Sequence, residues 1–178
     1  MIGAVRNRRA AWVLALSSVF ATAGCNTAVT PSPDSSTAAA ACPVTIANSS
    51  VPPGANPAPG QHGNGKLWTG LWPGGIVIVD PRWVQSDGSI NLKWWWWRSH
   101  EAAGTLRIAG RRLDARTTPL TGEIPDGYGL EGFQASSIIF PNPGCWEVTG
   151  SSGGAALTFV TLVQMPLPFL EPTASAPA

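Results

Sequence analysis

The chain has 178 residues, which suffice for one ordinary domain with flanking segments but not comfortably for two. Charged residues make up only 12%, beside 20 glycines and 17 prolines, and this composition suits short strands and tight turns better than a helical bundle. The formal charge of +1 falls to −2 without Arg6, Arg8 and Arg9, since eight basic residues then face ten acidic ones. A near-neutral domain argues against nucleic acid as a partner.

The first 24 residues have the features of a cleaved signal peptide. Three arginines precede "AAWVLALSSVFATA" (10–23), an uncharged run too short to span a bilayer permanently. "TAGC" (22–25) resembles the lipobox of bacterial lipoproteins, although Thr22 stands where Leu is usual. The resemblance implies that Cys25 is acylated and anchors the exported protein to the bacterial cell membrane. Ala21-Thr22-Ala23 also satisfies the rule for ordinary secretion, which is the alternative.

The number of cysteines separates these two alternatives. The chain has three: Cys25, Cys42 and Cys145. If Cys25 carries lipid, the other two make an even pair in an oxidising compartment, whereas plain secretion leaves one thiol over. The sequence therefore favours the lipoprotein, with a disulfide between Cys42 and Cys145. In the chain-entropy model, closing a loop of about 100 residues stabilises a domain by roughly 4–5 kcal/mol.

Residues 25–60 are predicted to form a flexible, lipid-anchored tether, because proline is frequent among Ser, Thr and Ala and Asp34 is the only charged residue of this segment. "ACPVTIAN" (41–48) is the exception. Val44 and Ile46 alternate there, so the Cys42 segment is expected to dock on the domain as an edge strand. At the other end, residues 166–178 are predicted to be a disordered tail.

Between residues 61 and 165 the sequence shows seven short apolar runs, each bounded by turn residues. The predicted strands are 66–72, 76–80, 90–97, 104–110, 132–140, 145–148 and 156–163. We expect an all-β fold, a single small antiparallel β-sandwich, with a barrel as the alternative. "IIFPNPGCWEVTG" (138–150) resembles the E-to-F passage of immunoglobulin-like domains, which favours an immunoglobulin-like sandwich for residues 61–165.

The stretch from Cys42 to Val163 also resembles a family of uncharacterised exported bacterial lipoproteins. The similarity rests on five motifs in this order: "CPVT", "HGNGKLWTGLWPGG", "GRRLD", "GYGLEGFQ" and "FPNPGCWEVTG". It implies an exported location and an immunoglobulin-like fold, and it implies no activity.

Four consecutive tryptophans in "NLKWWWWRSH" (91–100) raise the question of a ligand platform. Because side chains alternate along a strand, Trp94 and Trp96 are expected in the core. Trp95 and Trp97 share a face with Lys93, so they are expected to be at least half exposed. Three roles compete for this pair: packing on the outer face with Arg107 of the next strand stacked on the rings, a stacking platform for sugar rings, and contact with the membrane interface. Packing is the commonest role of aromatic residues on strands.

Other motifs give little support for catalysis or metal binding. Gly150-Ser151-Ser152-Gly153-Gly154 matches G-x-S-x-G, but no histidine follows it, so we interpret it as a hairpin turn. His62 and His100, the two histidines, have no ligand-type spacing around them. Asp114 is expected to pair with an arginine of "GRRLDAR" (110–116) at a strand end.

These patterns favour a membrane-anchored, non-catalytic cell-envelope module with a structural or protein-interaction role. The alternative is a glycan-binding or cell-wall-binding module that uses Trp95 and Trp97 together with Arg98. An envelope hydrolase is a distant third hypothesis, without assigned catalytic residues. The expected partners are membrane lipid through the acylated Cys25 and an envelope protein or glycan. We expect no cofactor and no metal.

Overall fold

The computed structural model describes residues 41–166, so the signal peptide, Cys25, the first part of the tether and the tail from residue 167 lie outside the described residues. Within residues 41–166 the fold is all-β, as the composition predicts. The only helices in this range are three single 3-10 turns: η1 (Pro73–Gly75), η2 (Pro81–Trp83) and η3 (His100–Ala102). None of the helices in the described range is long and apolar enough to cross a membrane.

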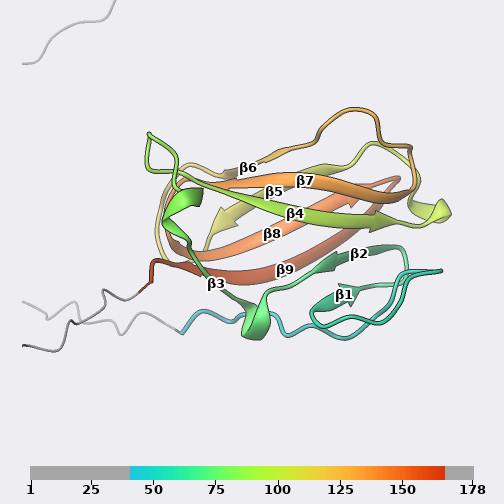
Figure 1. Ribbon diagram of the computed structural model, residues 1–178, viewed down its shortest axis with the longest axis horizontal. Coiled ribbons are helices and arrows are strands. Elements are labelled where there is room, and N and C mark those ends of the chain that lie inside the picture. The colour runs from blue at the N-terminus through green and yellow to red at the C-terminus, as the bar shows by residue number, and fades with distance from the viewer. Residues whose placement is uncertain (1–40, 167–178) are drawn as a thin grey trace, which may run out of the picture. The chain divides into compact units, whose positions relative to one another are not determined.

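The described residues form nine strands in one hydrogen-bonded sheet (Figure 1). In chain order the strands are β1 (Gln61–Gly63), β2 (Leu67–Gly70), β3 (Ile76–Ile78), β4 (Ile90–Arg98), β5 (Arg107–Arg112), β6 (Leu120–Glu123), β7 (Gly132–Phe140), β8 (Gly144–Ser152) and β9 (Ala155–Gln164). Across the sheet the order is β1-β2-β4-β7-β6-β5-β8-β9-β3. All pairings are antiparallel except that of β3 with β9.

The sheet is curled, so that strands far apart in its order approach each other. β2, near one edge, contacts β9, near the other. The side chain of Asn64, just before β2, donates a hydrogen bond of 2.7 Å to the Ala156 carbonyl of β9. The immunoglobulin-like antiparallel sandwich is therefore not confirmed, because a sandwich has two separate sheets. Here every strand is hydrogen-bonded to its neighbour in one sheet, and one pair is parallel.

All seven predicted strands are present, and β1 and β6 are additional. β6 lies in a stretch that the sequence marks as turn-like because of Pro119, Gly122 and Pro125. Gly122 has a packing role instead. A Cβ atom at this position would come within 2.5 Å of the Ile108 Cβ on β5, so the close approach of β5 and β6 requires a residue without a side chain.

Two of the four consecutive tryptophans fill the core, as the alternation predicts. Trp94 and Trp96 expose 4% and 0% of their surface. The ring of Phe159 on β9 stacks on Trp94 at 5.5 Å and lies 6.1 Å from Trp96. Gly150 on β8 makes room for them, since a Cβ atom there would lie 2.2 Å from the Trp96 ring. The aromatic cluster thus spans the inside of the curled sheet from β4 to β9.

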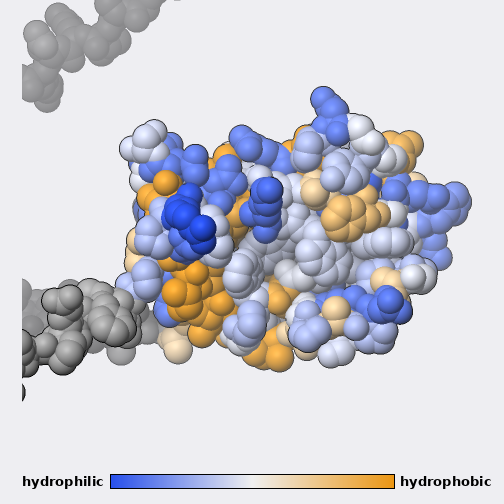
Figure 2. Space-filling view, in the orientation of Figure 1, coloured by the Kyte–Doolittle hydropathy of each residue, from blue (hydrophilic) through white to orange (hydrophobic). Residues whose placement is uncertain are grey.

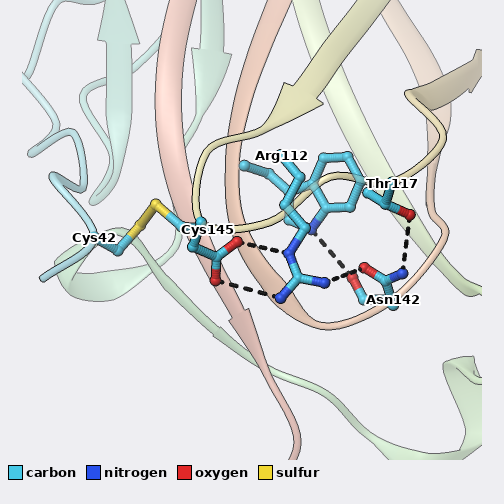
Figure 3. A network of polar contacts seen from close by, with 7 residues as sticks. Cys42, Arg112, Thr117, Asn142 and Cys145 are labelled. Carbon is cyan, nitrogen blue, oxygen red and sulfur yellow. Dashed lines mark hydrogen bonds and ion pairs between the residues drawn. A yellow bond between two sulfur atoms is a disulfide. The ribbon is translucent and has the colours of Figure 1, made fainter. Parts of the chain in front are cut away.

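The segment that begins at Cys42 lies along β9 and is held by a disulfide (Figure 3). Cys42 is bonded to Cys145 at the start of β8, with 5.5 Å between their Cα atoms. The Thr45 amide donates to the Val160 carbonyl at 2.9 Å, and the Val160 amide donates to Thr45 Oγ1 at 2.8 Å. Two hydrogen bonds to β9 thus dock this segment, although it does not form a regular strand.

We expect the Cys42→Ala/Cys145→Ala variant to lose about 2–5 kcal/mol of unfolding free energy, because the cross-link restricts the unfolded chain over a separation of 103 residues. Urea denaturation followed by tryptophan fluorescence measures the loss. Reduction of the wild type with dithiothreitol should reproduce it, whereas the variant should not respond to dithiothreitol. Equal stability of the oxidised wild type and the variant would contradict this role.

Candidate functional site

The outer face of β4 carries Asn91, Lys93, Trp95 and Trp97. Trp95 and Trp97 are both partly buried, so the expectation that at least half of each is exposed is wrong. Trp95 lies over Gly70 of β2, where a Cβ atom would come within 2.4 Å of the indole Nε1. Trp97 has Trp68 of β2 on one side and Phe133 of β7 on the other. Neighbouring strands therefore cover much of both rings.

Trp95 lines two of three neighbouring hollows that share Lys93 as a lining residue. The hollows have volumes of about 250, 500 and 400 Å³, and Lys93 lines each of them. We call this surface the Lys93 groove. Its aromatic walls are Trp72, Trp83, Trp95 and Phe133, and polar side chains between them are Gln85, Asn91 and Ser137. Trp97 does not line it, so the structure separates the two outward tryptophans of β4.

Trp72 and Trp83 reach the groove from turns and not from strands. Trp72 precedes η1, where Gly74 has a φ of 62°, a left-handed conformation that favours glycine. Trp83 ends η2, whose first turn is capped by the Asp80 side chain accepting from the Arg82 amide. The two ring centroids are 5.7 Å apart and the ring planes are inclined by 59°. One wall of the groove therefore has two differently oriented aromatic faces.

The charge of the groove is positive. Lys93 is exposed and forms no ion pair with any of residues 41–166. Arg82, at the rim, is paired with Asp80 at 2.6 Å, and its hydrogen bonds lower the pKa of the Asp80 carboxyl to about 2. No carboxylate lines any of the three hollows. Glu123, outward on β6 opposite Ser137, also lies outside the lining.

Figure 2 shows one face of the domain, in the orientation of Figure 1. The middle of this face, over β4, is pale, which denotes intermediate hydropathy. Blue hydrophilic side chains and separate orange apolar patches surround it. Among the large apolar residues that the described chain exposes, Phe133, at 49%, is the one that lines the Lys93 groove. The exposed prolines Pro59, Pro73 and Pro125 also line the hollows, so the groove combines aromatic, polar and proline side chains.

A second cleft, of about 490 Å³, lies at the end of β4 and contains His100, Glu101 and Glu131, with Trp97 on its wall. His100 Nδ1 lies 2.9 Å from Glu131 Oε2, and Glu101 pairs with Lys66 at 3.6 Å. The His100 and Glu131 side chains are 94% and 54% exposed. The buried Ser99 hydroxyl in the same cleft has no hydrogen-bond partner in the described structure, and it forms no contact with His100 that would activate it.

Arg98 lies on the inner face of β4 and is only 2% exposed. Its guanidinium donates hydrogen bonds of 2.5 Å to the carbonyls of Gly104 and Gly129, while Nε has no partner in the described structure. Burial lowers the pKa of this arginine. This placement separates the Arg98 side chain from the outer face that carries Trp95 and Trp97, because even-numbered residues of β4 point inward. Arg98 joins two loops, and it borders the second cleft beside Trp97 although only 2% of it is exposed.

Two of the three arginines of "GRRLDAR", Arg111 and Arg112, are engaged within the domain, and Figure 3 shows the contacts of Arg112. Arg112 binds Asp114 at 2.6 Å and the Asn142 side chain at 2.7 Å. The hydrogen bond from Arg112 lowers the pKa of the Asp114 carboxyl, against an opposing effect of burial. Arg111 pairs with Glu147 at 2.8 Å. The predicted ion pair at a strand end is confirmed, and it engages Arg112, while Glu147 engages Arg111. Arg116 is exposed and forms no ion pair with residues 41–166.

The G-x-S-x-G motif forms the turn between β8 and β9, as predicted. Gly153 and Gly154 have φ of 54° and 79°, and Ser152 is paired with Ala155 across the two-residue turn. The Ser152 hydroxyl lies 2.8 Å from the Ala102 carbonyl, so it is a buried structural group. Among residues 41–166, no group of three or more His, Cys, Asp or Glu side chains is placed to hold a metal ion.

The sequence did not reveal that Trp72, Trp83 and Phe133 surround Lys93. Alternation along β4 places Lys93 beside Trp95, but it says nothing about which strands lie on either side. The same limit explains Arg107, which was expected next to the tryptophans. β5 pairs with β6 and β8, so β7 and β6 separate it from β4 in the sheet.

No protein-family model matches the chain, and no curated protein matches it. A crystal structure from Bacillus anthracis described as a "Putative Lipoprotein" is similar at 12% identity and a TM-score of 0.38. The similarity covers 58% of this chain and 77% of that chain. The resemblance to a family of exported lipoproteins stays a prediction, and the function has to be argued from the residues of this chain.

We expect Arg98→Lys to lower the unfolding free energy by about 2–4 kcal/mol, because an ammonium group cannot replace both hydrogen bonds of the buried guanidinium. Hydrogen exchange should become faster in residues 99–106 and 124–131, the two loops that Arg98 joins. Arg107→Lys, at an exposed site on β5, is the control and should leave both measurements unchanged. An Arg98→Lys variant as stable as the wild type would show that the Arg98 guanidinium does not hold the two loops together.

Proposed function

We propose that the protein is an exported bacterial lipoprotein, anchored to the cell membrane through lipid on Cys25, and that its β domain is a non-catalytic binding module of the cell envelope. The exported location is supported mainly by the disulfide between Cys42 and Cys145, because stable disulfides form in oxidising compartments outside the cytosol. That pairing leaves Cys25 as the remaining cysteine of the sequence. Its place directly after "TAG" supports lipidation over ordinary secretion.

The Lys93 groove supports binding as the task of the domain. It combines aromatic walls with a few polar side chains and one cation that has no ion-pair partner among residues 41–166, which is the usual make-up of a recognition surface. A structural or protein-interaction role and a glycan-binding role are two forms of this proposal. The sequence assigns glycan binding to Trp95 and Trp97 together, whereas the groove holds Trp95 with Trp72 and Trp83.

The hydrolase alternative has one observation in its favour, namely the cleft that joins His100 to Glu101 and Glu131. A general base needs a nucleophile within hydrogen-bonding reach and partial shelter from water. The imidazole of His100 is 94% exposed and does not contact the Ser99 hydroxyl. We therefore rank binding above hydrolysis, and the absence of catalysis stays a prediction.

We expect Cys25→Ser to abolish lipid attachment and to release the protein from the membrane fraction, because the serine hydroxyl does not replace the acylated thiol. Metabolic labelling with radioactive palmitate, followed by cell fractionation, measures both effects. The Cys42→Ser/Cys145→Ser variant is the matched control and should keep its label. A Cys25→Ser protein that stays membrane-bound and is processed normally would show that the lipidation proposal is wrong.

A further inference from the structure

We infer that the Lys93 groove binds an extended polysaccharide whose sugar units carry carboxylate groups. This inference rests on the proposed role as a binding module and names its ligand class. The groove offers three things that such a chain needs: several aromatic faces, hydrogen-bonding side chains between them, and a cation without a partner in the described structure.

The aromatic faces fit successive sugar rings. A pyranose has an apolar face of C–H groups that packs on the electron-rich face of an aromatic ring. The rings of Trp72 and Trp83 are inclined by 59°, with centroids 5.7 Å apart, and Trp95 lines a hollow together with Trp72. The tryptophans are partly buried, so their orientation is fixed by the domain before a ligand arrives. Differently inclined faces suit a twisted chain of sugars better than one flat ring system.

Polar side chains lie between these rings where sugar hydroxyls need partners. Asn91 and Lys93 are outward neighbours on β4, and Ser137 lies opposite Lys93 on β7. Gln85 follows Trp83 along the wall. Amide and hydroxyl groups both donate and accept hydrogen bonds, as neutral sugar hydroxyls do. Polar and aromatic side chains therefore line the same hollows.

The charge distribution favours an anionic ligand. Lys93 lines all three hollows, and it has no carboxylate partner among the described residues. The second cation, Arg82, is already paired with Asp80. A uronate carboxylate over Lys93 would form a charge-assisted hydrogen bond, which is stronger than one to a neutral hydroxyl.

An extended peptide is the competing occupant, because the pairing of β4 with β2 covers only residues 96–98 and leaves the β4 backbone beside Lys93 without a strand partner on that side. Peptides bind sheets mainly by adding a strand at such an edge. We choose the anionic polysaccharide because its carboxylates match Lys93 and its sugar rings match the aromatic lining, and a protein partner is one outcome of the test below.

The test measures oligosaccharide binding by the full chain, exported and purified in mild detergent. The probes are a mannuronate hexamer, which carries carboxylates, and cellohexaose, which is neutral, each titrated by isothermal calorimetry. We expect the wild type to bind the mannuronate hexamer about tenfold more tightly than cellohexaose, as one charge-assisted hydrogen bond implies.

Two pairs of variants assign this binding to the groove. Trp95→Ala should lower the affinity for both probes about tenfold, whereas Trp97→Ala, on the same strand and face but outside the groove, should change it less than about twofold.

Lys93→Gln should lower the affinity for mannuronate about five- to tenfold and leave the affinity for cellohexaose unchanged. Arg107→Gln, which removes an exposed charge on β5, should have no effect. If Trp95→Ala does not fold, Lys93→Gln carries the test, because it replaces an exposed side chain.

Three results would overturn the inference, and they differ in what they say about the proposed function. Equal affinity of the wild type for both probes, unchanged by Lys93→Gln, would leave a neutral-glycan module and refute the anionic ligand. Binding lost in Trp97→Ala but kept in Trp95→Ala would move the site to the second cleft. No binding of either probe, together with capture of an envelope protein that Trp95→Ala abolishes, would keep the binding module and reject its polysaccharide ligand. If that capture also fails, the proposed function fails with the inference.

Discussion

The packing of Trp94 and Trp96 against Phe159 is the constraint on which the rest of the structure depends. β4 and β9 are far apart in the order of the sheet, and these rings fill the space that the curl encloses between them. Gly150 has to lack a side chain for Trp96 to fit. Since alternate residues of β4 point inward, burying this pair fixes Lys93 and Trp95 on the outer face. The groove therefore depends on the core: a one-residue slip of β4 would place Lys93 inside and remove the groove.

The local pattern of a strand predicts which of its side chains point into the core. It does not predict which strands lie beside it. The alternation in "INLKWWWW" correctly places Trp94 and Trp96 in the core. The exposure of Trp95 was overestimated because Gly70, which lets β2 lie beneath the indole, is distant in sequence. Trp72 and Trp83 were beyond prediction for a similar reason. Their directions are set by the turns at η1 and η2 and by the path of the chain between β3 and β4, neither of which a hydrophobic pattern records.

The same distinction applies to the fold. Apolar runs between turn residues identify seven strands, because burial and turn chemistry are local properties. Pairing is not local: β3 joins β9 in parallel although more than half of the domain separates them in sequence. The sequence does not predict β6, because Gly122 suggests a turn. In the structure, Gly122 allows Ile108 of β5 to come close to β6. A single curled sheet and a sandwich share the same strands, so composition and periodicity do not distinguish between them.

The disulfide and the Lys93 groove lie on different strands, although the chain that follows Cys42 continues to Pro59, which lines one of the hollows. Cys42 is bonded at the start of β8, and the segment after it lies along β9, so the described end of the tether occupies that side of the domain. The Lys93 groove lies over β4, with walls from β7 and from the turns after β2 and β3. A chain pulled from Cys42 is held first by the disulfide and by the hydrogen bonds to Val160. Load on the tether therefore enters the domain at β8 and β9, away from the strands that form the groove.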